Sequence, residues 1–371
     1  TKTFKLFGNK KAPDIGLDIG SSYDRAIQLS EKGGGYRIEH FAIEQLREGS
    51  VVDNYVHDIE SISSANERAV RTSCTPSLAS AIERAVRTSG SRSKSCAIAV
   101  SGPAVFTKTI SLPSNLAEAD VESQIQIEAN QYVPYPLDEV SLDFDIIGPS
   151  ARNPDLIDIL LAACKSENVE NRQDALEAAG LNAKVVDVEA FAIANAFELI
   201  RERDHLSKNE AVGIFDIGRD LTTLLVLRGG RVIYNREHPF GGHQLLEETM
   251  RRYEMTPEQA SFFERAEEGP EDFEQEVLEP FQLNIVHQIS RALQFFASSN
   301  EYSPISTIYL AGGTASLKGL AAMVQQELGL TTRVADPISG LDVSPSVAVA
   351  ALKRNTPNLM VAMGLALRGF D

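Results

Sequence analysis

Two short Asp-Ile-Gly turns carry the residue types that a phosphate and a metal ion require. The first is Asp18–Gly20 and is followed by two serines, and the second is Asp216–Gly218 and is followed within five residues by two threonines. A glycine lets the backbone approach a phosphate closely, and hydroxyl and N–H groups can then bond its oxygens. A carboxylate beside such a turn can hold Mg²⁺ through water molecules. Either sequence alone predicts only a tight turn. The surrounding strands must show whether it is also a phosphate-binding site.

The strands around the two turns repeat. Each turn ends an apolar strand and is followed by two more strands joined at glycines, about 198 residues apart in the chain from Gly20 to Gly218. A third apolar strand ends in two glycines at Ile308–Gly313. We therefore expect two facing hairpins that clamp the phosphates of a nucleotide, with the third loop against its base or sugar. The expected strands are Ile15–Gly20, Arg25–Ser30, Tyr36–Ile43, Val212–Gly218, Thr223–Leu227 and Arg231–Tyr234.

A short duplication precedes the middle of the chain. The seven residues Glu67–Ser73 recur identically as Glu83–Ser89, and both copies lie in helix-favouring sequence. The pattern predicts a tandem copy of one helix but leaves open which copy occupies the helix position in the fold.

Composition excludes several classes of protein. The 371 residues carry a formal net charge of −17, which disfavours a nonspecific grip on nucleic acid or anionic lipid. The three cysteines lack metal-ligand spacing, so buried, inert thiols in a reducing compartment are expected. No run approaches the roughly 18 apolar residues of a membrane span, and no signal peptide is expected.

Stretches along nearly the whole chain resemble the actin/Hsp70/FtsA superfamily, and within it the PilM family of type IV pilus assembly proteins. The glycine turns indicate only the superfamily, whereas the segments Tyr132–Val140 and Leu160–Lys165 indicate the PilM family. The remaining stretches that carry the resemblance are Gly16–Ser22, Lys184–Ala190, Phe215–Gly218, Pro239–Gly242, Leu310–Thr314 and Gly364–Arg368.

The resemblance implies an α/β, actin-like (ribonuclease H-like) two-domain fold with duplicated hairpin cores and an inserted FtsA-like subdomain. The implied parts are a first-domain core at 13–92, completed by 182–205 and the C-terminal helix 357–371, an inserted subdomain at 93–181, a second-domain core at 206–246 and 281–356, and a helical subdomain at 247–280.

The resemblance also implies roles for individual residues. ATP or ADP with Mg²⁺ is the implied cofactor, with Asp18 and Asp216 at the metal. Glu189, at the start of a helix, matches the position near the attacking water, which makes it and Asp216 the candidate catalytic residues; a surface glutamate at a helix start is the alternative. The implied nucleotide-binding residues are Gly20, Ser21, Ser22, Arg25, Gly218, Thr222, Thr223, Gly241, Gly242, Gly312, Gly313 and Thr314.

Three positions depart from the family pattern. Arg219 stands where a small residue is usual, Arg25 where a lysine is usual, and Glu264 where a lysine usually meets the nucleoside. A carboxylate at that last position would repel a nucleotide. We therefore expect slow or absent ATP hydrolysis.

The implied partner is the cytoplasmic N-terminal peptide of a PilN-type inner-membrane protein, held in a groove between the first domain and the inserted block, with pilus motor or platform components as further candidates. The expected location is cytoplasmic, and the protein is expected to be peripheral at the inner membrane through that partner. No direct membrane insertion is expected, since the sequence ends without an amphipathic helix after Arg368.

Three alternative functions stay open. They are a nucleotide-free scaffold, a small-molecule kinase of the same fold and an FtsA-like filament former.

Overall fold

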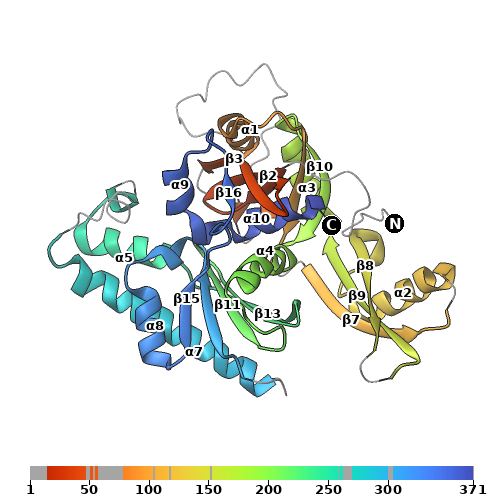
Figure 1. Cartoon of the computed structure of the whole chain (residues 1–371). Helices are drawn as coiled ribbons and strands as arrows, with labels where there is room; N and C mark the ends of the chain where they lie inside the picture. The colour runs from red at the N-terminus through yellow and green to blue at the C-terminus, as the bar shows by residue number, and fades with distance from the viewer. Residues whose placement is uncertain are drawn as a thin grey trace. The chain divides into compact units, whose positions relative to one another are not determined.

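The computed structural model describes residues 15–46, 51–52, 55–56, 78–102, 105–116, 118–150, 153–257, 259–261, 270–299 and 304–370. The chain divides into two compact units (Figure 1). The first comprises residues 1–192, 341–348 and 361–371, and the second comprises residues 193–340 and 349–360.

A six-stranded mixed sheet forms the core of the first unit, in the order β10-β6-β1-β2-β3-β16. Helices α1 and α3 contribute apolar side chains to the cluster that also contains β1 and β6. Helix α10 approaches β1 closely, because a Cβ at Gly16 would collide with the backbone of Ala362 and Ala366. The bounds are β1 Ile15–Ile19, β2 Tyr23–Lys32, β3 Gly35–Gln45, β6 Ser95–Val100, β10 Asn182–Val188, β16 Asp342–Val343, α1 Leu78–Ser89, α3 Ser166–Ala178 and α10 Met360–Leu367, with the short pair β4 Val51–Val52 and β5 Tyr55–Val56.

The inserted block holds a separate three-stranded antiparallel sheet, ordered β7-β9-β8. Its strands are β7 (Val105–Pro113), β8 (Val140–Pro149) and β9 (Leu156–Lys165). Helix α2 (Glu118–Tyr132) covers this sheet by burying Val121, Ile125 and Ala129, three side chains at four-residue spacing.

The second unit contains a five-stranded sheet with the order β13-β12-β11-β14-β15. This is the order of the first sheet again, since β1, β2, β3, β6 and β10 correspond in turn to β11, β12, β13, β14 and β15 with the same parallel and antiparallel neighbours. The duplicated hairpin core predicted from the two Asp-Ile-Gly turns is therefore confirmed. The bounds are β11 Val212–Ile217, β12 Thr222–Arg228, β13 Arg231–His238, β14 Thr307–Ala311, β15 Thr331–Val334, α4 Glu189–Arg203, α5 His243–Tyr253, α7 Glu279–Ser299, α8 Leu320–Leu328 and α9 Val349–Arg354.

One helix of the second unit starts later than expected. The sequence predicts a helix from Leu317, whereas α8 begins at Leu320. Residues Gly313–Ser316 form a 3₁₀ turn, and Gly319 takes a φ of 83°, a left-handed conformation that an α-helix does not allow.

The second copy of the duplicated segment forms α1, and the first copy lies outside the described residues. Two differences favour the second copy. Ile82 is completely buried in α1, while Asn66 stands at the equivalent place in the first copy. Gly90 ends the helix with a φ of 79°, and its equivalent is Cys74. A buried asparagine and a left-handed cysteine both cost free energy.

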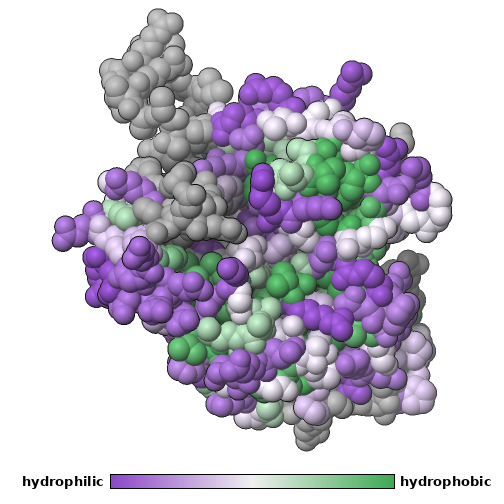
Figure 2. Space-filling model, turned by 60° about the vertical axis from the view of Figure 1, so that its left-hand side comes forward, coloured by the Kyte–Doolittle hydropathy of each residue, from purple (hydrophilic) through white to green (hydrophobic). Residues whose placement is uncertain are grey.

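Two of the three cysteines lie in the described residues. Cys96 and Cys164 are free and buried there, as expected, whereas Cys74 lies outside them. Within the same residues no helix has the length and apolar character needed to cross a bilayer. The face drawn in Figure 2 is mainly hydrophilic, with separate apolar patches.

Candidate functional site

The second unit brings three of the predicted loops together. Gly242 donates its N–H to the carbonyl of Gly218 at 2.9 Å, and the hydroxyl of Thr314 donates to the same carbonyl at 3.4 Å. His243 donates its N–H to the carbonyl of Arg219 at 2.8 Å. The Asp-Ile-Gly turn, the start of α5 and the loop after β14 therefore meet at one place, as the sequence predicts for a nucleotide site.

Glycines make this close approach of backbones possible. A Cβ at Gly312 would collide with the carboxylate of Asp216 and the carbonyl of Ile217, and a Cβ at Gly241 would collide with the backbone of Arg219. At Gly313 a Cβ would lie 3.2 Å from the side chain of Asn358. Other atoms of the protein occupy the places where these Cβ atoms would stand, so the glycines allow the three loops to pack directly against one another.

The two threonines of the second turn differ in their surroundings. Thr222 is buried, and its hydroxyl donates to the carbonyl of Phe240 at 2.7 Å. Thr223 is partly exposed and lies opposite Asp216 in the antiparallel register. Thr222 therefore fixes the hairpin to the segment before α5, and Thr223 is the threonine placed beside the predicted metal ligand.

Arg219, which replaces a small residue, turns toward the start of α5. Its guanidinium lies 3.3 Å from Nδ1 of His243 and 3.8 Å from the carboxylate of Asp220. This residue adds a positive charge beside the turn without closing it, since its side chain is about a quarter exposed.

In the first unit, the predicted residues Asp18 and Arg25 form an ion pair. Nη1 of Arg25 lies 2.8 Å from Oδ2 of Asp18, and about an eighth of each side chain is exposed. Burial raises the pKa of Asp18, and the charge of Arg25 acts against that rise. At the turn itself, the N–H of Gly20 donates to the carbonyl of Tyr23 at 3.2 Å, and the N–H of Leu46 donates to the carbonyl of Ser22. These two hydrogen bonds hold the backbone on either side of Ser21.

A buried arginine beneath this turn was missed by sequence reasoning. Arg172 on α3 is 2 % exposed. Burial lowers its pKa, and the charges of Cys164, Glu189 and Asp18 counteract that effect. Arg172 thus links the predicted metal ligand Asp18 electrostatically to the candidate catalytic Glu189. The sequence did contain a sign of this burial, because Arg172 falls on the same face of α3 as the apolar residues Val169 and Leu176.

Asp24 is the second buried charge that the sequence did not reveal. It is 0 % exposed, and neither carboxylate oxygen has a hydrogen-bond partner. Burial, followed by the negative charge of Asp18, raises its pKa well above the ordinary value. In the second hairpin the corresponding position is Thr222, whose hydroxyl is bonded.

The surroundings of the two aspartates bear on the predicted metal site. No group of three or more His, Cys, Asp or Glu side chains converges in the described parts of the chain. Mg²⁺ is commonly held by one or two carboxylates together with water and substrate phosphates. Asp216 in the second unit is a carboxylate of that kind, whereas the carboxylate of Asp18 in the first unit is already paired with Arg25. Glu264, the predicted nucleoside neighbour, lies outside the described residues.

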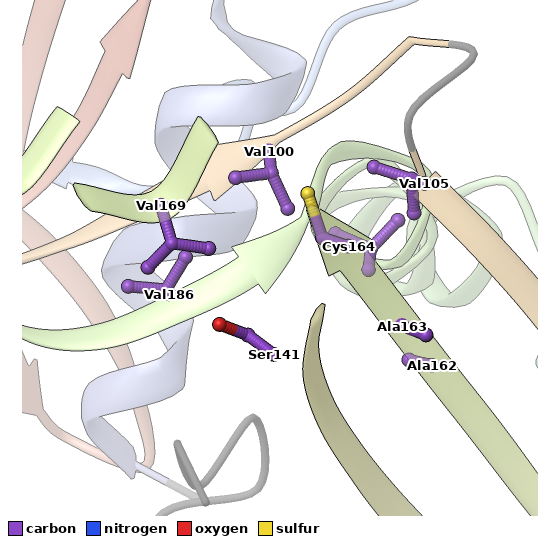
Figure 3. A pocket seen from close by; sticks show the side chains of 9 residues that line it. Val100, Val105, Ser141, Ala162, Ala163, Cys164, Val169 and Val186 are labelled. Atoms are coloured by element: carbon purple, nitrogen blue, oxygen red, sulfur yellow. The ribbon is translucent and has the colours of Figure 1, made fainter. Parts of the chain in front are cut away.

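A second candidate surface lies inside the first unit, where the inserted sheet meets the core sheet (Figure 3). A small cavity of about 20 Å³ opens there. Val100, Val186 and Val188 line it from the core strands β6 and β10, and β7, β8, β9 and α3 supply the opposite wall. That wall consists of Val105, Ser141, Ala162, Ala163, Cys164 and Val169. We call this region the apolar seam.

Comparisons with known proteins agree with this architecture. The family model described as "Type IV pilus assembly protein PilM" matches residues 16–79 and 75–370. A solved structure titled "PilM-PilN type IV pilus biogenesis complex" has 24% sequence identity and a TM-score of 0.76, and covers 98% of this chain and 100% of that one. The ethanolamine utilization protein EutJ from Carboxydothermus hydrogenoformans has 16% identity and a TM-score of 0.54, covering 99% and 92%.

Proposed function

Because the chain belongs to the type IV pilus assembly protein PilM family, we propose that it is an actin-like, ATP-binding adaptor of pilus assembly. Its partner in this proposal is the cytoplasmic N-terminal peptide of a PilN-type inner-membrane protein. The similar solved complex contains PilM and PilN, which supports the choice of partner. The adaptor would be cytoplasmic and reach the inner membrane through that peptide.

The apolar seam is the observation that carries the peptide site. Its lining is almost entirely aliphatic, and Val105 is the one lining residue that is partly exposed, so a side chain from outside would enter beside Val105. A cavity of about 20 Å³ admits only the tip of an aliphatic side chain. The peptide would therefore insert one apolar anchor and lie along β10, which is an edge strand of the six-stranded sheet.

The loop cluster of the second unit supports nucleotide binding. The turn at Gly218 would approach the phosphates, while Gly242, Gly312 and Thr314 would lie against the nucleoside. A bound nucleotide with Mg²⁺ would supply charge that stabilises one conformation of the adaptor. Hydrolysis, if it occurs, should be slow, because Arg219 and Glu264 replace residues that would place phosphate and nucleoside.

A nucleotide-free scaffold is the second candidate, and the ion pair between Arg25 and Asp18 favours it. This pair already neutralises the carboxylate that a metal would use. Heating the protein with and without saturating ATP and Mg²⁺ separates the two candidates, since a ligand that binds only the folded state raises the melting temperature. An unchanged melting temperature would favour the nucleotide-free scaffold over the ATP-binding adaptor.

The peptide proposal is tested by titrating a labelled PilN-type tail peptide against the full chain. Ser141→Leu fills the apolar seam and excludes the anchor side chain, so binding should weaken about tenfold or more, as for the loss of an apolar anchor. Ser111→Leu is the matched control, because Ser111 lies on an exposed part of β7 away from the seam. Failure of the unmutated protein to bind would remove the adaptor function, and equal weakening by both variants would remove the seam as the site.

A further inference from the structure

Helix α7 presents an exposed ridge along its whole length. Leu283, His287, Arg291 and Phe295 are all exposed at four-residue spacing, with Leu283 at 42% and Phe295 at 44%. Side chains four apart form the ridges by which helices pack against one another. The opposite face of α7, which includes Ile285, Ile289 and Phe296, is buried in the core of the second unit.

The C-terminal half of this ridge is basic. The guanidinium of Arg236, on the edge strand β13, lies 4.8 Å from the ring centre of Phe295. His238, also on β13, has a pKa that is lowered by burial and then by the positive charges of Arg236 and Arg291. Within the described residues no ion pair involves Arg291.

The N-terminal end carries the opposite charge. Glu279 begins α7 one ridge step before Leu283 and is exposed, and Glu271, Glu274 and Glu276 are exposed in the turn that leads into it. The helix dipole accounts for acid at the start and base at the end of a helix. It does not account for two large apolar side chains left in water on the same ridge.

We propose that the α7 ridge pairs with the α7 ridge of a second copy of this chain, related by a two-fold axis. In a two-fold contact the same surface faces itself, so acid at one end and base at the other are complementary only when the helices run in opposite directions. Glu279 of each copy then lies toward Arg291 of the other, and Leu283 lies near the axis. Phe295 of each copy then lies opposite the turn before α7 of the other, where Glu274 and Glu276 are exposed.

Charge reversal tests the pairing on the full-length protein. Sedimentation of the unmutated protein over a concentration series should show a monomer–dimer equilibrium that weakens with salt. Arg291→Glu should weaken association about tenfold or more, since it sets like charges opposite each other twice in the dimer. The double variant Glu279→Arg with Arg291→Glu should restore it.

The matched control is Arg354→Glu, an exposed arginine in the last turn of α9 in the same unit, which should leave association unchanged. Leu283→Ser should weaken association without changing its salt dependence, and thermal unfolding verifies that each variant is folded. A protein that stays monomeric at all concentrations would overturn the proposal, as would a double variant no better than Arg291→Glu alone.

Discussion

The guanidinium of Arg25 lies 2.8 Å from the carboxylate of Asp18, directly across the first hairpin. The corresponding pair in the second hairpin is Asp216 and Thr223, in the same antiparallel register. The duplicated fold therefore carries a built-in cation at one turn and a hydroxyl at the other. A metal ion approaching Asp18 must share that carboxylate with Arg25.

We expect the loss of Arg25 to make nucleotide binding more dependent on Mg²⁺. In Arg25→Gln, ATP affinity without Mg²⁺ should fall about tenfold, as for the loss of a hydrogen bond to a charged group, and Mg²⁺ should recover most of it. Calorimetric titration with and without Mg²⁺ measures the difference. Arg84→Gln is the control, because Arg84, on α1, also pairs with a carboxylate of the first unit, Glu44 of β3, at 3.4 Å. Identical Mg²⁺ dependence in both variants would contradict the role given to Arg25.

The glycine after β14 should be far less replaceable than Gly319, which also has a positive φ. Gly312 has φ 82° and ψ 174°, a combination essentially restricted to glycine, and faces the Asp216 carboxylate, whereas Gly319 has φ 83° and ψ −14°, in the left-handed helical region, and borders open space. Gly319→Ala therefore bears only the cost of a left-handed residue, about 1–2 kcal/mol. Gly312→Ala should lose more stability and also the melting-temperature rise with ATP. Equal losses in the two variants would show that the loop cluster is loosely packed.

Much of this architecture follows from the sequence, because the Asp-Ile-Gly turns recur in the same strand context and local pattern decides strand order in a hairpin. Helix α4 lies at Glu189–Arg203, where the pattern places it. Arg172 and Asp24 could not be placed, since their burial depends on contacts between segments far apart in the chain. The nucleotide and peptide roles stay predictions, because no local pattern fixes a ligand.

Asp24 should make the protein less stable as the pH rises. Its folded-state pKa is well above the ordinary value, so folding takes up a proton between the unfolded and folded pKa values, and the free energy of unfolding falls with pH across that window. Asp18 and Glu44 reinforce the shift, whereas Arg25 and Arg84 oppose it. Asp24→Asn should remove this slope and raise the melting temperature at pH 7.5 more than at pH 4.5.

The control for this experiment is Asp120→Asn, at an exposed position on α2. Thermal unfolding across the pH range measures both variants. A melting temperature for Asp24→Asn that changes with pH as in the unmutated protein would show that Asp24 is ionised in the fold.

The two copies of the duplicated segment should be unequal when either is removed. The copies are offset by 16 residues, from Glu67 to Glu83. Deleting residues 62–77 leaves α1 intact and shortens only the connection before it, and halving a loop changes stability by about 0.6 kcal/mol. Deleting residues 78–93 keeps the register but brings Asn66 to the place of Ile82 and Cys74 to the place of Gly90. That deletion should cost several kcal/mol, through a buried amide and a left-handed non-glycine residue.

Thermal and urea unfolding of the two deletions, compared with the full chain, give the difference. Adding Asn66→Ile and Cys74→Gly to the second deletion should restore most of the lost stability, because these changes rebuild the helix that the fold uses. Two deletions of equal stability would mean that the first copy fits the α1 position as well as the second.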